Sequence, residues 1–204
     1  MLEQILGQLK ALHVVDYGGL IFGILYVFFA TKEKPICWVF GAFSSLSIAY
    51  AGVFLYKLYS DAILNLIYFL MAIWGVWSWT KSKGNSTNLA VGKMRVMDHV
   101  IYVGASTLLS LPLAYIFSTY TDARVPWLDA ITTAFALGAT VLTIFKFLDN
   151  WIYWIFIDLV YIGIYFSQGA YLFTLLFIIY IILAFRGFIS WKRTYSKKVN
   201  LEQV

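Results

Sequence analysis

Long apolar stretches alternate with short polar segments along most of the chain. Read between charged clusters and turn-forming residues, this pattern predicts seven helices, over residues 16–31, 36–55, 60–80, 96–117, 127–146, 150–166 and 168–190. Most approach the roughly 20 mostly apolar residues that a helix needs to cross the hydrocarbon core of a bilayer. The pattern therefore predicts an all-α polytopic membrane protein with seven transmembrane helices.

The polar segments divide the chain into six parts. These are an N-terminal segment (1–15), a first group of three helices (16–80), a polar loop (81–95), a single helix (96–117), a second group of three helices (127–191) and a basic tail (192–204). The N-terminal segment has apolar side chains at helical spacing and is predicted to lie along the membrane interface. It lacks the features of a cleavable signal peptide, so none is expected.

Composition excludes the soluble classes of protein. Hydrophobic residues make up 62% of the 204 residues and charged residues 12%, against about 45–50% and about 25% in an average soluble domain. That apolar excess is too large for one soluble core, and it also excludes disorder. The single cysteine, Cys37, excludes an internal disulfide and a cysteine-based metal cluster, and we expect neither a metal nor a cofactor.

The positions of the basic residues predict the orientation of the chain. Seven crossings would place three of the 15 basic residues on the side of the N-terminus, namely Lys10, Lys57 and Arg124, and the other twelve on the opposite side. Because basic residues concentrate in cytoplasmic loops, the N-terminus is predicted outside and the C-terminus inside. The same residues adjoin anionic lipid headgroups, so the net charge of +5 does not indicate nucleic-acid binding.

The two three-helix groups match one another in sequence. A displacement of 113 positions places Asp16 on Asp129 and Trp38 on Trp151. The pairs at a displacement of 112 are Tyr59 with Tyr171, Tyr68 with Tyr180, Ala72 with Ala184, Gly75 with Gly187, and Trp79 with Trp191. An intervening single helix lets both repeats run in the same direction, which predicts a 3+1+3 arrangement of parallel repeats. Transporters built from such repeats bind their substrates near the midplane between them.

The positions where the repeats differ supply the candidate site. Residues 150–166 carry a bulky, aromatic and acidic face, whereas the matching face of residues 36–55 is small, with Ser45 at the position of Asp158. A charge inside a membrane helix costs about 2.5–3.5 kcal/mol and usually faces a cavity or a partner. Asp158 therefore binds a ligand, makes a structural hydrogen bond or carries a proton. The candidate substrate-binding residues are Ser45, Asn65, Tyr68, Trp151, Trp154, Asp158, Tyr161 and Tyr180.

Two motifs in combination resemble those of the PnuC-type vitamin transporters. The first is Asn65-Leu-Ile-Tyr68 followed by Trp74-Gly-Val-Trp77-Ser-Trp79, and the second is Asn150-Trp151-Ile-Tyr-Trp154-Ile-Phe-Ile-Asp158-Leu-Val-Tyr161. The resemblance covers residues 16–194 and implies seven helices in a 3+1+3 parallel repeat, similar to a SWEET transporter. It also implies a multi-pass protein of the bacterial plasma (inner) membrane, assembled as a homo-oligomer, specifically a trimer.

The same resemblance implies a function. Family members carry nicotinamide riboside, and relatives carry thiamine or other vitamins, by facilitated diffusion. A cytoplasmic vitamin kinase then traps the substrate by phosphorylation. Asn65 stands where Gln is expected in nicotinamide riboside carriers, so thiamine or another vitamin stays an alternative.

The chemistry of the candidate residues suits such a substrate. Both vitamins present a flat cationic heteroaromatic ring, which Tyr and Trp faces attract by about 0.5–2 kcal/mol each. Asp158 can neutralise the cation, and Asn65 can donate and accept hydrogen bonds at once. The absence of Lys and Arg from mid-span positions disfavours phosphorylated vitamins.

Other classes of membrane protein fit the sequence less well. An enzyme is not expected, because the chain has no His-Glu-x-x-His motif and no paired intramembrane carboxylates, and because His13 and His99 lie near the interfaces. A retinal-type light sensor would need a lysine deep in the last helix, where residues 168–185 contain none. A SWEET-like sugar carrier stays a more distant alternative, since Trp and Asn also suit neutral sugars.

Overall fold

The protein is built from α-helices joined by short connections. The computed structural model describes residues 2–81, 89–121 and 125–202. Its elements are α1 (Leu2–Lys10), α2 (Val14–Ala30), α3 (Ile36–Tyr50), the π-helix η1 (Ala51–Leu55), α4 (Tyr59–Lys81), α5 (Val96–Tyr120), α6 (Pro126–Ile144), α7 (Asn150–Ser167) and α8 (Tyr171–Glu202).

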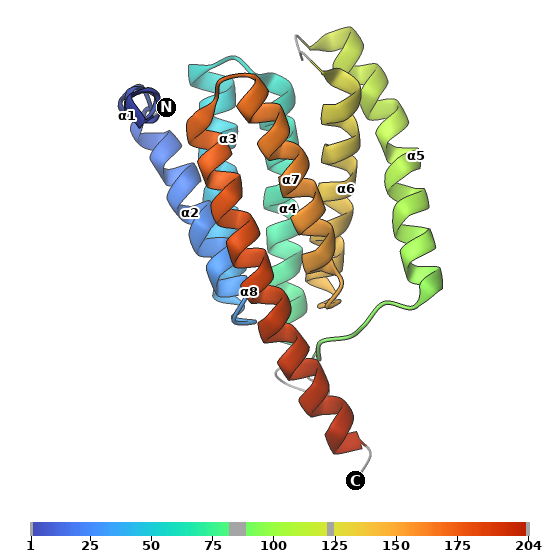
Figure 1. Ribbon diagram of the computed structural model, residues 1–204. Coiled ribbons are helices and arrows are strands. Elements are labelled where there is room, and N and C mark those ends of the chain that lie inside the picture. Colours follow the sequence, from blue (N-terminus) through green and yellow to red (C-terminus); the bar gives the residue numbers. More distant parts are fainter. Residues whose placement is uncertain (1, 82–88, 122–124, 203–204) are drawn as a thin grey trace.

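Six of these helices form a closed ring. Helix α2 packs on α3, α3 on α4, α4 on α6, α6 on α7, α7 on α8, and α8 returns to α2. Helix α5 packs against α6 and lies outside the ring, at the edge of the molecule in Figure 1. The ring therefore places helices from both halves of the chain around one centre.

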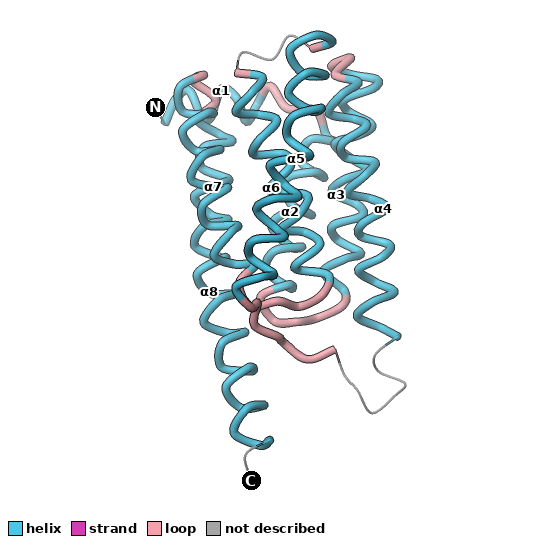
Figure 2. Tube along the Cα trace, turned by 90° about the vertical axis from the view of Figure 1, so that its right-hand side faces the viewer, coloured by secondary structure: helices cyan, strands magenta, loops and turns pink. Residues whose placement is uncertain are grey.

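The number of membrane crossings depends on how the first two helices are counted. Among the described residues, six helices are long and apolar enough to cross a membrane: α3 continued by η1, α4, α5, α6, α7 and α8. Helix α2 has 17 residues, and it reaches spanning length only together with α1, from which it is bent by 117°. Counting that bent pair as one span gives seven, the predicted number. The chain ends lie at opposite ends of the bundle in both Figure 1 and Figure 2, as an odd number of crossings requires.

The helix limits agree with the prediction except at the C-terminal end. Helix α8 continues to Glu202, so residues 192–202 of the predicted basic tail (192–204) prolong the last helix, and residues 203–204 lie outside the described residues. Neither Gly nor Pro occurs after Gly187, so nothing in this stretch breaks the helix. Of the predicted polar loop, residues 82–88 lie outside the described residues.

Helix α1 is tied to the turn between α7 and α8. The side-chain amide of Gln8 donates to the Gly169 carbonyl oxygen at 2.7 Å, and its oxygen accepts from the Leu172 backbone N–H at 2.9 Å. Gly169 has φ +72°, a left-handed conformation that favours glycine. The amphipathic N-terminal helix is thereby held against the second half of the chain.

Four tryptophans at matched sequence positions make matched contacts. The rings of Trp38 and Trp79 meet edge to face at 5.5 Å and 86°, and those of Trp151 and Trp191 at 5.4 Å and 88°. Edge-to-face pairs contribute about 0.5–1.5 kcal/mol beyond the area that they bury. The two halves thus use the same packing unit at the same level of the bundle.

Glycines make room for the inner ring of each pair. A Cβ on Gly75 would lie 2.1 Å from the ring of Trp38, and a Cβ on Gly187 would lie 2.5 Å from the ring of Trp151. Both distances are far below a van der Waals contact. Each tryptophan can therefore lie flat against a neighbouring helix only because that helix has a glycine there.

We predict that Gly75→Ala and Gly187→Ala both lower the thermal midpoint of the purified protein by several degrees. Overpacking of a buried contact costs about 1–3 kcal/mol, more than the roughly 0.5–1 kcal/mol that alanine gains over glycine in a helix. Gly163→Ala is the matched control, since a Cβ there meets nothing within 4 Å. Scanning fluorimetry in detergent measures all three, and equal midpoints would contradict the packing described.

Candidate functional site

A cavity of about 220 Å³ lies at the centre of the ring, and all six ring helices line it. Its lining combines aromatic rings, small residues and hydroxyls. The lining residues are Gly23, Tyr26, Val27 and Ala30 of α2; Trp38, Gly41, Ser44 and Ser45 of α3; Asn65, Tyr68 and Ala72 of α4; Thr140 and Thr143 of α6; Asn150, Trp151, Trp154 and Asp158 of α7; and Phe177, Tyr180 and Ala184 of α8.

The cavity brings together seven of the eight candidate residues. These are Ser45, Asn65, Tyr68, Trp151, Trp154, Asp158 and Tyr180. The eighth, Tyr161, is absent from the lining, because its ring stacks on Phe177 at 4.7 Å and 28°. Phe177 rather than Tyr161 therefore presents an aromatic ring to the cavity at this point.

Small residues on α2 and α3 leave room for the cavity, and large residues of α7 and α8 line its other side. Gly41 and Ser45 of α3 line the cavity opposite the bulky face of α7. On α2, a Cβ at Gly23 would lie 2.5 Å from the hydroxyl oxygen of Tyr180, so glycine is needed for that hydroxyl to reach its place. The predicted contrast between a small and a bulky face thus describes the two sides of this cavity.

Asp158 is the one charged residue among the described residues that line the cavity. Its exposed fraction is 3%, and it makes no hydrogen bond or ion pair with any residue that the structure describes. A buried charge is stable only when it is paired or hydrogen-bonded. A cationic or hydrogen-bond-donating ligand can therefore pair with Asp158 without first breaking a bond between Asp158 and another protein residue.

A short chain of hydrogen bonds fixes the ring of Trp154. Its indole N–H donates to the hydroxyl of Thr143 at 3.4 Å, and that hydroxyl lies within donating distance of both the Ala139 carbonyl oxygen (2.9 Å) and the side-chain oxygen of Asn150 (3.1 Å). The amide of Asn150 in turn donates to the Phe147 carbonyl oxygen. Asn150 is fully buried, so this chain holds the aromatic wall of the cavity in one orientation.

Thr143 and Asn150 were not among the candidates. A signal for Thr143 was present in the sequence, since Thr133, Thr140 and Thr143 recur at helical spacing in an otherwise apolar helix. Polar residues on one face of a membrane helix mark the side that packs against other helices. Asn150 is the first residue of the second family motif, but it lies next to a predicted turn and was assigned no role in the site.

Asn65 lines the cavity from α4 and is also tied to its own helix. Its side-chain N–H donates to the Asp61 carbonyl oxygen at 2.9 Å, one turn earlier. The amide oxygen is thereby left to accept a hydrogen bond from a ligand. Asn65 and Phe177 occupy matching positions in the two halves of the sequence and differ sharply in polarity. Both line the cavity.

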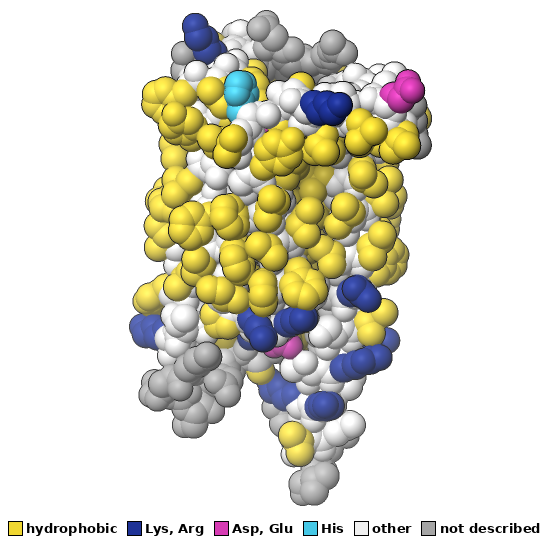
Figure 3. Space-filling view, turned by 90° about the vertical axis from the view of Figure 1, so that its left-hand side faces the viewer, with side chains coloured by type: hydrophobic (Ala, Val, Ile, Leu, Met, Phe, Trp, Pro, Cys, Tyr) yellow, Lys and Arg dark blue, Asp and Glu magenta, His cyan; other side chains and the backbone are white. Residues whose placement is uncertain are grey.

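A ring of apolar helices around a cavity that both halves of the chain line is an arrangement found in membrane transporters. The face of the molecule seen in Figure 3 carries a broad band of hydrophobic side chains, with most of the visible Lys and Arg side chains below it. The chain belongs to the family described as nicotinamide mononucleotide transporter, whose family model matches residues 13–193. This membership confirms the family resemblance seen in the two motifs.

Individual relatives agree with this membership. The chain is 22% identical to the nicotinamide riboside transporter PnuC of Escherichia coli (strain K12), over 87% of this chain and 84% of the relative. It is 25% identical to the protein of the same name from Neisseria mucosa, over 84% and 69%. A crystal structure of the vitamin B3 transporter PnuC has the same fold, with a TM-score of 0.72 at 23% identity over 90% of this chain and 82% of that chain.

These findings identify the cellular location of the protein. It is a multi-pass protein of the bacterial inner membrane, and its family and fold are those of transporters. The described residues include no group of three or more His, Cys, Asp or Glu side chains that would hold a metal ion.

We predict that Asp158→Asn keeps or raises the thermal midpoint of the ligand-free protein, because the Asp158 side chain has no hydrogen bond or ion pair among the described residues that the change would remove. Asp149→Asn is the matched control, since Asp149 directly precedes the first residue of α7. Asp149 is equally buried, but it accepts a hydrogen bond from the Met94 N–H at 2.8 Å and lies 3.9 Å from His99 Nε2. Replacing this partnered carboxylate should lower the midpoint by several degrees. A large loss of stability in Asp158→Asn would show that its carboxylate is structural.

Proposed function

We propose that this protein carries a flat, singly cationic nucleoside across the membrane, and that the nucleoside is nicotinamide riboside. The buried, unpartnered carboxylate of Asp158 in an aromatic cavity is the observation that carries the proposal. A pyridinium ring supplies the missing positive charge, and Trp154 and Tyr180 offer faces that attract it. Two of the relatives are named nicotinamide riboside transporters, which supports the same substrate.

The cavity favours the nucleoside over its phosphorylated form. The family description refers to the mononucleotide, which adds a phosphate to the riboside. Among the described lining residues there is no Lys, Arg or His, and the one charge is the carboxylate of Asp158. A phosphate placed there would lose its hydration, gain no cation and meet a like charge.

The same set of residues supports transport by facilitated diffusion. Within the described lining, Asp158 has no second acid and no histidine beside it with which to bind a coupling ion or relay a proton. Phosphorylation by a cytoplasmic vitamin kinase converts the cation into a species that the cavity rejects. Trapping and selectivity then have one physical cause.

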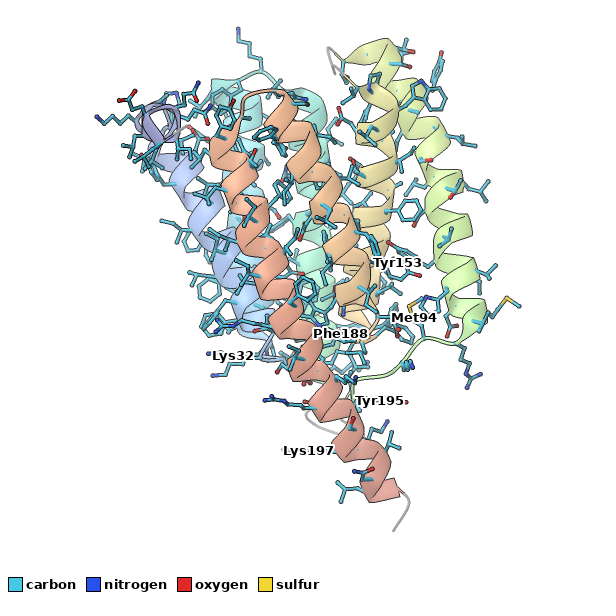
Figure 4. The ribbon with its side chains drawn as sticks, viewed as in Figure 1. Lys32, Met94, Tyr153, Phe188, Tyr195 and Lys197 are labelled. Carbon is cyan, nitrogen blue, oxygen red and sulfur yellow. The ribbon has the colours of Figure 1, made fainter. Side chains whose placement is uncertain are left out.

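The proposed architecture is a 3+1+3 set of parallel repeats, SWEET-like, in which α5 is the linker helix. The matched tryptophan and glycine contacts of the two halves support it. The proposed orientation places the N-terminus outside and the end of α8 in the cytoplasm. Lys32 at the end of α2 and Lys197 on the protruding part of α8 lie toward the same end of the bundle in Figure 4, as the positive-inside rule requires.

A ligand panel tests the proposed function. Isothermal titration on purified protein and uptake into gradient-free vesicles would compare nicotinamide riboside, its mononucleotide, thiamine and glucose. We expect the riboside to bind and to equilibrate across the membrane. The mononucleotide should bind at least about a hundredfold more weakly, since an unpaired desolvated charge costs more than about 3 kcal/mol. Equal binding of the mononucleotide would contradict the charge argument, and preference for thiamine or glucose would replace the substrate.

A further inference from the structure

A layer of tryptophans closes one end of the cavity. Trp38 and Trp151 belong to the cavity lining, whereas Trp79 and Trp191 are packed against them from outside the lining. All four are almost completely buried, with exposed fractions of 1%, 3%, 3% and 0% in the order Trp38, Trp151, Trp79, Trp191. We call these four residues the tryptophan layer. It lies at the end of the bundle where α2 and α6 end and α3 and α7 begin.

The two outer tryptophans link the halves of the chain crosswise. Trp79 of α4 donates its indole N–H to the carbonyl oxygen of Ile144, the last residue of α6, at 3.0 Å. Trp191 of α8 donates to the carbonyl oxygen of Ala30, the last residue of α2, also at 3.0 Å. Carbonyls at a helix end have no partner within their own helix. Each bond joins a helix-end carbonyl of one half to an indole donor of the other half, and the Ala30 carbonyl oxygen also accepts from the Glu33 backbone N–H at 3.0 Å.

One ion pair joins the halves at the same level. Lys146 Nζ lies 3.3 Å from Glu33 Oε2, with side chains only 12% and 20% exposed. The two residues are 113 positions apart, which is the displacement between the repeats, and both have φ 55°. Lys146 also lies 4.7 Å above the ring of Trp79. The ion pair thus connects equivalent turns of the two halves and touches the tryptophan layer.

The inner tryptophans make the closed layer less stable than it would otherwise be. The indole nitrogens of Trp38 and Trp151 are buried and have no hydrogen-bond partner among the residues described. A buried donor without an acceptor is unfavourable, and exposure to water would remove the penalty. The closed layer consequently depends on its cross-links, because its own central donors favour opening.

We propose that the tryptophan layer is the gate through which solute leaves the cavity, and that the Glu33–Lys146 ion pair is the latch that holds it shut. Opening requires the halves to separate at this end, which breaks the ion pair and both indole hydrogen bonds together. The inference rests on the proposed function for the identity of the solute. The closure itself is a property of the protein without any ligand.

The single cysteine of the chain reports on this gate. Cys37 is fully buried beside Trp38 and belongs to the same packed cluster. N-ethylmaleimide labels this cysteine only when the layer opens, so the labelling rate measures how often it opens. The rate is followed by intact-mass spectrometry at a temperature well below the thermal midpoint. Glu33→Gln and Lys146→Gln should each label roughly tenfold faster, since they remove a charged hydrogen-bonded partner. The double exchange Glu33→Lys with Lys146→Glu should return the rate to near the parent value.

A neighbouring charge gives the matched control. Lys32 is exposed and lies 4.0 Å over the ring of Phe28 in its own half, so Lys32→Gln should label at the parent rate. Parent-like labelling in Glu33→Gln and Lys146→Gln would overturn the proposal. So would a double exchange that labels as fast as the single variants, because that would show that the pairing of the charges does not hold the layer.

A separate measurement distinguishes the gate from the proposed substrate. All of these rates are taken without ligand, so they do not depend on which solute is carried. Nicotinamide riboside is then added to the parent protein. If the mutational pattern holds but the riboside leaves the labelling rate unchanged at concentrations that should fill the cavity, the substrate is contradicted and the gate is supported.

Discussion

Water is absent from the hydrocarbon layer, so every buried polar group of a membrane protein needs a partner inside the protein. Most buried polar side chains of the described residues meet that constraint, some within one turn of helix and others across the fold. The hydroxyl of Thr140 donates to the Ala136 carbonyl oxygen, and the carboxylate of Asp149 accepts from a backbone N–H. Asp158 does neither, although it is just as deeply buried. In the proposed function, that unpaired carboxylate sets the sign of charge that the cavity accepts.

The two halves of the chain are alike in their tryptophan–glycine packing and differ in the residues that line the cavity. Trp38 and Trp151 lie against glycines of the third helix in each half, and the outer tryptophans bond across to the other half. In the cavity the corresponding positions diverge, with Asp158 on α7 where α3 has Ser45. Duplicated packing gives a closed ring with two similar seams. Because the linings of the two halves differ, one side of the cavity carries the acidic residue and the other carries small side chains.

The sequence predicts the spans well because the membrane limits the structures that can cross it to apolar helices of fixed length. Seven of the eight candidate residues reach the cavity, since helical spacing and repeat differences both report which face turns inward. Tyr161 has the right spacing but stacks on Phe177, a contact that no periodicity reveals. The pairing of Glu33 with Lys146 joins turns 113 residues apart and depends on how the halves meet. Such contacts follow from tertiary packing alone.

The central claim is that the Asp158 carboxylate recognises the positive charge of the substrate. The most direct test compares the binding of nicotinamide riboside with that of its reduced dihydro form, which has nearly the same shape but an uncharged ring. The account predicts that the parent binds the cation at least about tenfold more tightly, and that Asp158→Asn abolishes this preference while Ser45→Ala keeps it. Equal affinity of the parent for both forms, or a preference that persists in Asp158→Asn, would contradict the claim.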